Sequence, residues 1–125
     1  MLNVLAAYGA FLGGTGVVAG ALGSHFLRKR LTEDRLKSWQ VAVQYQLLHA
    51  IAILALGLAK ITRPQQRQPL LHRALTLWSV GATLFSGSIY MLCLDRGPRG
   101  LMGPATPIGG LVMIAGWGSA FLAAL

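Results

Sequence analysis

Four long stretches of the chain carry almost no charged side chain, and each is long enough to cross a membrane as a helix. They cover residues 2–27, 41–59, 75–94 and 101–125. A spanning helix needs about 20 mainly apolar residues, because each residue rises 1.5 Å and the hydrocarbon layer is about 30 Å thick. The pattern therefore predicts an all-α fold, an integral membrane four-helix bundle with antiparallel spans, in a single transmembrane domain over residues 1–125.

The polar segment before the second span predicts an extension of that helix over residues 33–40, lying in the membrane interface. Thr32 stands before Glu33 and Asp34, and a hydroxyl followed by acids is typical of a helix N-terminus. A helix that starts there is longer than the hydrocarbon layer requires, so its first two turns lie outside. We interpret Trp39 as an interfacial anchor at the depth where indoles gather.

Prolines determine the expected start of the last span. Pro107 follows Thr106, an arrangement that suits the first helical position and its cap. We expect the regular helix to begin at Pro107 and residues 101–106 to be irregular backbone near the interface. Such backbone is tolerated at membrane depth only where protein or water covers its polar groups.

Glycines in the first span follow helical spacing, at intervals of 4, 3, 4 and 3 residues: Gly9, Gly13, Gly16, Gly20 and Gly23. This spacing places all five on one helix face. Rows of small residues let helices approach closely in lipid, where apolar contact alone gives little drive for association. The pattern predicts a helix-packing seam, and it leaves open whether the packed helix belongs to this chain, to a second copy or to another protein.

Composition agrees with a membrane protein and decides what the charge means. Hydrophobic residues make up 54% of the chain and charged residues 11%, whereas soluble domains carry about 25% charged residues. The net charge is +8, from 11 Lys and Arg against 3 Asp and Glu. The basic residues are confined to three short stretches between the spans, so we expect a lipid bilayer as the partner and no nucleic acid.

The distribution of these basic residues predicts an orientation. The first and third loops hold seven of the 11, and the second loop, on the side of both termini, holds the other four. Basic loops favour the cytoplasmic side, which predicts termini outside. Arg28, Lys29 and Arg30 directly follow the first span and are candidates for binding anionic lipid head groups, with a plain topology signal as the alternative.

Polar and ionisable side chains within the spans are the candidates for chemistry, since they are costly in lipid. Antiparallel spans bring several of them toward the same side of the membrane. We predict a polar cluster there: His25, Gln44, Tyr45, Gln46, His49 and Thr106. A further polar stripe follows one face of the third span: Ser79, Thr83, Ser86, Gly87 and Tyr90. These side chains either link helices by hydrogen bonds or line a pore, and the first interpretation is favoured.

The sequence points to no cofactor, no metal and no catalytic site. His25 and His49 would lie at different depths, which does not suit two axial ligands of one haem. No cluster of Cys or Glu supplies further metal ligands. Paired carboxylates, a serine hydrolase motif and a phosphate-binding glycine loop are also missing from the sequence. We therefore expect a protein that is not an enzyme.

Four segments resemble a known family. They are 20–25, 38–46 leading to His49, 85–90, and 103–110 with Gly116 and Trp117. They are similar to the four blocks of the YgdD-like family, small four-helix proteins of the bacterial inner membrane with mitochondrial relatives, which are classed as a domain of unknown function. The resemblance covers nearly the whole chain, although Ser24 stands where the family more often has Ala. It implies the fold and the inner (plasma) membrane, but no activity or site residue.

Two functions are compatible with these patterns. The leading expectation is an accessory or assembly subunit that packs against a larger membrane complex or against itself, because the small-residue faces exceed what four helices need. The alternative is a small oligomeric transporter or channel. A pore requires a polar face through the full depth of the membrane, yet residues 50–59 and 111–125 are almost wholly apolar, which favours the subunit.

Overall fold

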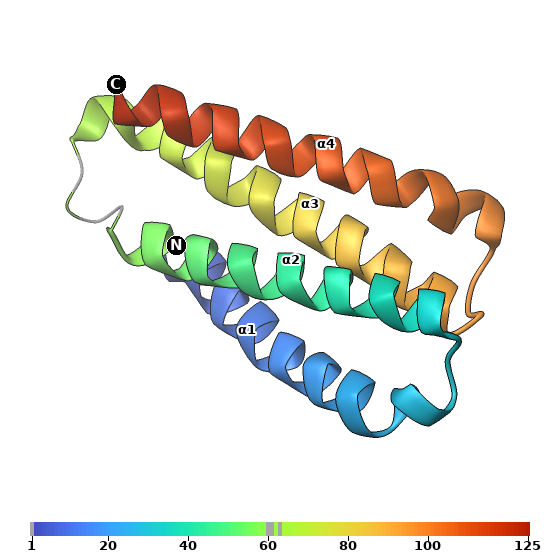
Figure 1. Cartoon of the computed structure of the whole chain (residues 1–125). Coiled ribbons are helices and arrows are strands. Elements are labelled where there is room, and N and C mark those ends of the chain that lie inside the picture. Colours follow the sequence, from blue (N-terminus) through green and yellow to red (C-terminus); the bar gives the residue numbers. More distant parts are fainter. Residues whose placement is uncertain (1, 60–61, 63) are drawn as a thin grey trace.

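A computed structural model describes residues 2–59, 62 and 64–125, and these residues form four long antiparallel helices (Figure 1). The helices are α1 (Leu2–His25), α2 (Glu33–Ala59), α3 (Gln68–Cys93) and α4 (Arg99–Ala124). Each is long and apolar enough to cross a membrane. The predicted all-α membrane bundle is confirmed.

The helices pack mainly on their neighbours in the chain. α1 contacts α2, α2 contacts α3, and α3 contacts α4, so α2 and α3 are the inner helices and α1 and α4 the outer ones (Figure 1). The α1–α2 and α3–α4 connections lie at one end of the bundle, and both chain termini lie at the other. The basic residues of the α1–α2 and α3–α4 connections therefore lie together at the end opposite the termini.

Helix boundaries follow local sequence signals, with two differences from the expected spans. The Thr32 hydroxyl accepts a hydrogen bond from the Arg35 backbone N–H at 3.4 Å, which confirms the expected start of α2. α1 ends at His25 and is followed by a short 3₁₀ turn, Leu27–Lys29. α3 begins at Gln68, earlier than residue 75. Pro69 stands in its first turn, where a missing N–H costs little, so it does not prevent this early start.

The expected start of the last helix at Pro107 is wrong. α4 begins at Arg99, and Pro104 and Pro107 both lie inside it. Thr106 is not a cap, since its hydroxyl donates to the Met102 carbonyl one turn back at 3.3 Å. The prolines deprive two carbonyls of their helical donors, those four residues earlier at Gly100 and Gly103. Both glycines are exposed near the end of the bundle, so water or head groups can satisfy their carbonyls.

The interpretation of Trp39 as an interfacial anchor is also wrong. Its side chain is buried between α1 and α3, with 4% of its surface exposed. The indole N–H donates to the Ala19 carbonyl of α1 at 2.8 Å, and the ring centroid lies 4.4 Å from that of Tyr90 in α3. Trp39 therefore joins three helices in the core.

α3 and α4 meet through a second set of glycines, Gly81, Gly109 and Gly116. A Cβ atom at Gly109 would lie 2.5 Å from the Phe85 backbone nitrogen and 2.9 Å from the Gly81 carbonyl oxygen. A Cβ at Gly116 would lie 2.6 Å from the Trp78 ring. The backbones approach closely at Gly109, and Gly116 makes room for the Trp78 ring, which explains why α3 and α4 form a close pair.

Candidate functional site

The five glycines of the expected packing seam face α2 of the same chain. A Cβ at Gly9 would lie 2.8 Å from the Leu54 backbone nitrogen, and one at Gly16 would lie 2.7 Å from Leu47 Cδ2. At the far end, a Cβ at Gly23 would lie 2.7 Å from the Trp39 ring. Gly13 and Gly20 make looser approaches to the same helix. The structure therefore answers the question the sequence left open: the seam holds α1 against α2.

Gln46 is the centre of a buried hydrogen-bond network between three helices. Its amide nitrogen donates to the Leu12 carbonyl and to the Thr15 hydroxyl of α1, each at 2.9 Å. Its amide oxygen accepts a hydrogen bond from the Tyr90 hydroxyl of α3 at 2.7 Å. The side chain thus uses both ends of its amide, as a polar group deep in a membrane bundle must.

His49 is buried in a second, separate arrangement. The Trp117 indole N–H of α4 donates to His49 Nε2 at 3.1 Å, and His49 Nδ1 lies 2.8 Å from the Tyr45 carbonyl oxygen. An indole nitrogen can only donate, so Nε2 accepts and Nδ1 carries the proton. These two contacts describe a neutral imidazole that links α2 to α4, with no free nitrogen for a metal.

The predicted single polar cluster does not form. His25 and Gln44 are exposed, and Tyr45 keeps 45% of its surface exposed. Thr106 pairs with the Ser88 hydroxyl at 2.6 Å instead of joining Gln46 or His49. On α2 the rings of Tyr45 and His49 do stack, with centroids 6.2 Å apart, whereas Gln44 is exposed. A shared side of the membrane fixes depth only, and the rotations of α1 and α4 place His25 and Thr106 away from these rings.

The polar stripe of α3 forms interhelical contacts at several depths. The Ser86 hydroxyl donates to the Ala42 carbonyl of α2 at 2.7 Å, and Thr83 pairs with the Tyr8 hydroxyl of α1 at 2.5 Å. Ser79 bonds within its own helix, and Gly87 has open space beside it. Most of the stripe therefore links helices.

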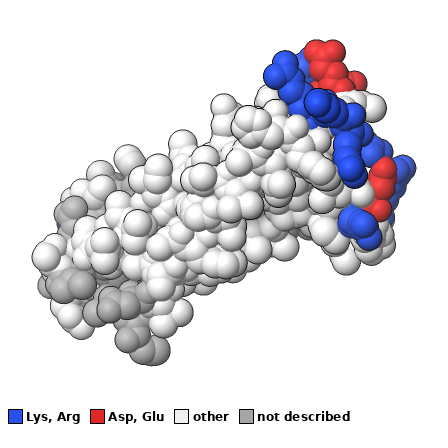
Figure 2. All heavy atoms as spheres, turned by 90° about the horizontal axis from the view of Figure 1, so that it is seen from below, with Lys and Arg blue, Asp and Glu red and all other residues white. Residues whose placement is uncertain are grey.

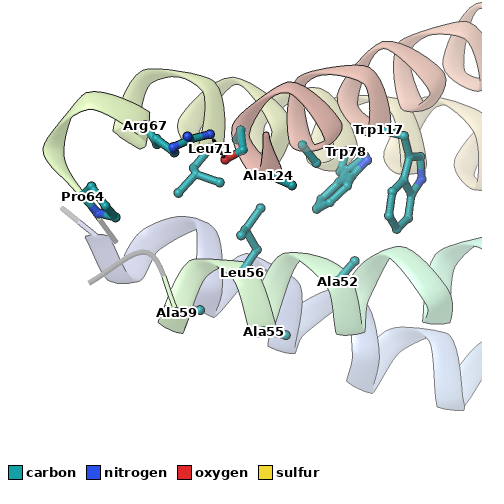
Figure 3. A pocket seen from close by; sticks show the side chains of 12 residues that line it. Ala52, Ala55, Leu56, Ala59, Pro64, Arg67, Leu71, Trp78, Trp117 and Ala124 are labelled. Carbon is teal, nitrogen blue, oxygen red and sulfur yellow. Dashed lines mark hydrogen bonds between the residues drawn. The ribbon is translucent and has the colours of Figure 1, made fainter. Parts of the chain in front are cut away.

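A cavity of about 590 Å³ opens between α2, α3 and α4 near the end with the termini (Figure 3). Alanines of α2 and α4 line its sides, and Trp78 and Trp117 lie at its inner end (Figure 3). Arg67, the one charged residue among the described lining residues, donates to the Ala123 carbonyl oxygen at 2.8 Å. The walls fit an apolar chain, and the lining residues that the structure describes include no acid, no histidine and no nucleophile.

Charged side chains gather at the opposite end, where the α1–α2 and α3–α4 connections meet (Figure 2). Asp95 accepts hydrogen bonds from Arg35 Nη1 at 2.6 Å and Nη2 at 3.1 Å, and from Arg99 Nη2 at 2.7 Å. Its backbone is left-handed, with φ 53°, a conformation that Asp tolerates better than most residues. Asp95 thereby joins α2 to α4, a junction that the local sequence does not indicate.

Three further basic residues follow α1. Arg28, Lys29 and Arg30 are exposed beyond α1 at the charged end, and the Arg30 guanidinium lies over the Phe26 ring at 4.2 Å. Lys60 and Arg63 of the second loop lie outside the described residues.

Acid should weaken the Asp95 junction. Hydrogen bonds from Arg35 and then Arg99 lower the pKa of the Asp95 carboxyl from 3.8 to about 2. The stabilisation that the ionised Asp95 carboxylate gives is therefore complete above the ordinary pKa of an aspartate, and it is lost as the pH falls through about 2. We expect the unfolding temperature of the protein in detergent to decline between about pH 4 and about pH 2 more steeply than that of Asp95→Asn. Parallel declines in the unfolding temperatures of the wild type and Asp95→Asn would contradict a stabilising role of this junction.

A bundle of four apolar spans with charges at its ends is a small multi-pass integral membrane protein. The chain belongs to the family described as "Protein of unknown function (DUF423)", whose model matches residues 19–110. The expected membership of the YgdD-like family is confirmed by the relatives.

The relatives come from bacteria and yeast. The "UPF0382 membrane protein C1782.12c" of Schizosaccharomyces pombe is 42% identical, over 86% of this chain and 90% of its own. The "UPF0382 membrane protein SH2409" of Staphylococcus haemolyticus is 36% identical, over 81% and 78%. The "UPF0382 inner membrane protein YgdD" of Escherichia coli K12 is 32% identical, over 81% and 73%. No solved structure matches the chain.

Proposed function

We propose that this protein is a non-enzymatic accessory or assembly subunit, held against another membrane protein by the outer face of α1. The supporting observation is a second row of small residues on α1, turned away from α2. All its members are exposed: Ala7, Ala10, Gly14 and Ala21. No atom lies within 4 Å of the position a Cβ would take at Gly14.

The two small-residue faces of α1 differ in what covers them. The glycine seam is occupied by α2, whereas the outer row has no partner helix among the described residues. Small residues at helical spacing allow close van der Waals packing between helices in lipid, which is the main attraction available there. A helix with small residues on both faces is therefore suited to join its own bundle to a neighbour.

The alternative role, a small oligomeric transporter or channel, has less support. A water path needs polar groups that face open space along the depth of the membrane. Gln46, Tyr90 and His49 are instead engaged in hydrogen bonds with neighbouring helices. These contacts favour a rigid packing unit over a conducting one.

We further propose a bacterial inner membrane location with the termini outside. Seven of the 11 Lys and Arg belong to the α1–α2 and α3–α4 connections and the adjoining helix ends. Basic residues near the ends of spans favour the cytoplasmic side. Accessibility of single cysteines placed in the loops of a cysteine-free variant tests this orientation.

The assembly role predicts that Gly14→Leu separates the protein from its companion without unfolding it. The wild type, gently solubilised from its own membranes, should retain a stoichiometric companion protein. Gly14→Leu should lose most of it, at least about tenfold, because leucine blocks close approach of a second helix. The matched control is Gly118→Leu, at another open glycine on the outer helix α4, and it should retain the companion.

Two results would contradict the proposal. A wild-type protein that purifies as a homo-oligomer without companions would favour the transporter. A companion retained equally by Gly14→Leu and Gly118→Leu would exclude the outer face of α1 as the contact.

A further inference from the structure

A groove of about 780 Å³ lies between α2, α3 and α4 at the charged end of the bundle. Its outer part is lined by the basic residues Arg35, Lys37 and Arg99, and its deeper part mainly by apolar residues and a glycine: Val41, Ile89, Gly103 and Pro107. Val41 lies about 6 Å deeper along α2 than Lys37, at 1.5 Å per residue. The groove therefore changes from cationic to apolar over one to two helical turns.

Three basic residues, and no acidic residue among those described, line the outer part of the groove. Arg35 and Arg99 share one carboxylate, that of Asp95. Lys37 lies 3.2 Å from Glu33, but both side chains are more than 60% exposed, and exposed pairs of this kind are weak. Guanidinium groups carry five N–H donors each, so Arg99 retains donors for a further anion.

The deeper part has room for a chain. No atom lies within 4 Å of a Cβ built at Gly103, which stands one turn beyond Arg99 on the same helix. Val41 of α2 and Ile89 of α3 line the groove with it. A free inorganic anion would use none of this apolar surface, whereas an amphiphile uses both parts.

We propose that this groove binds an anionic glycerophospholipid from the adjoining leaflet. The phosphate lies between Lys37 and Arg99, and an acyl chain follows Val41, Gly103 and Pro107 into the membrane. Ionised phosphate forms its strongest hydrogen bonds with Arg and Lys donors, and the ends of spans with such donors attract anionic lipids. The site is distinct from Arg28, Lys29 and Arg30, none of which lines the groove.

Native mass spectrometry of the full chain tests this site. The protein is taken from nanodiscs that contain equal amounts of phosphatidylglycerol and phosphatidylcholine, and the bound ratio of the two lipids is measured. We expect the wild type to retain phosphatidylglycerol selectively. The double variant Lys37→Gln/Arg99→Gln should reduce that ratio roughly tenfold. Both side chains are largely exposed, so the fold should persist.

The matched control removes the same charge at the same end of the molecule. Arg28→Gln/Lys29→Gln should change the bound ratio less than about twofold, because those residues lie outside the groove. An equal loss in both double variants would overturn the proposal in favour of general surface attraction.

A third variant distinguishes a lipid from a free anion. Gly103→Phe keeps every charge and fills the apolar part, so it should lower phosphatidylglycerol retention, and added inorganic phosphate should not compete. Full retention by Gly103→Phe, or displacement by inorganic phosphate, would overturn the assignment of a lipid.

Discussion

Gly9→Leu is expected to separate α1 from α2 and to cause the largest loss of stability of any single change in the seam. A Cβ at this position would lie 2.8 Å from the Leu54 backbone nitrogen and 3.0 Å from the Ala50 carbonyl oxygen. Backbone atoms of a helix cannot turn aside as a side chain can, so α1 must move away. Overpacking of a well-packed interior costs typically 1–3 kcal/mol, and we expect about 3 kcal/mol or more here.

Thermal unfolding in detergent measures this effect, with Gly14→Leu as the matched control. Both variants place the same residue on the same helix, five positions apart, but Gly14 faces open space. Gly9→Leu should lower the unfolding temperature by roughly 10 °C or more, and Gly14→Leu should leave it unchanged. Equal unfolding temperatures for Gly9→Leu and the wild type would contradict the observed packing.

The same geometry changes what a substitution at Gly16 reports. From the sequence alone, Gly16→Leu would test association with a partner. In the structure a Cβ at Gly16 would lie 2.7 Å from Leu47 Cδ2 and 3.4 Å from Gln46 Nε2. The variant would therefore disturb the bundle itself, and Gly14 is the position that tests a partner.

Trp39→Ala should also destabilise the bundle strongly. It would remove a buried ring that fills the space between α1 and α3 and contacts Tyr90 at 4.4 Å between centroids. It would also leave the Ala19 carbonyl without this donor, which the indole N–H now supplies at 2.8 Å. Replacement of large aromatic residues by alanine in a packed interior costs about 3–5 kcal/mol.

Trp39→Phe separates the two contributions, because it keeps most of the ring and removes the N–H. We expect it to cost about 1 kcal/mol, in the range measured for hydrogen bonds between membrane helices. Unfolding temperatures of both variants in detergent measure the difference. An interfacial anchor without packing contacts would give small and similar losses in both, which would contradict the burial of Trp39.

The elements of this fold could be predicted because their signals are local. Uninterrupted apolar stretches identify the four spans, and Thr32 before two acids identifies the start of α2. The spacing of the glycines places them on one face of α1. Each of these inferences uses residues that lie within a few helical turns of each other, where helix geometry alone fixes their relation.

The contacts of the site could not be predicted in the same way. Arg35 and Asp95 are 60 positions apart, and Gln46 and Tyr90 are 44 apart. Hydropathy gives the depth of a residue but not the rotation of its helix, so His25 and Gln44 were expected in a cluster and are exposed. Thr106 was expected as a cap because Pro107 is favourable at a helix start, but α4 continues through both prolines.

The most direct test of the assembly role is photo-crosslinking from position 14 in intact membranes. A photoreactive residue in place of Gly14 should yield one discrete adduct with another membrane protein. The same residue at position 118, on the outer face of α4, should yield none. Lipid adducts alone from both positions, or a dimer of this chain from position 14, would contradict a subunit held to another protein by the outer face of α1.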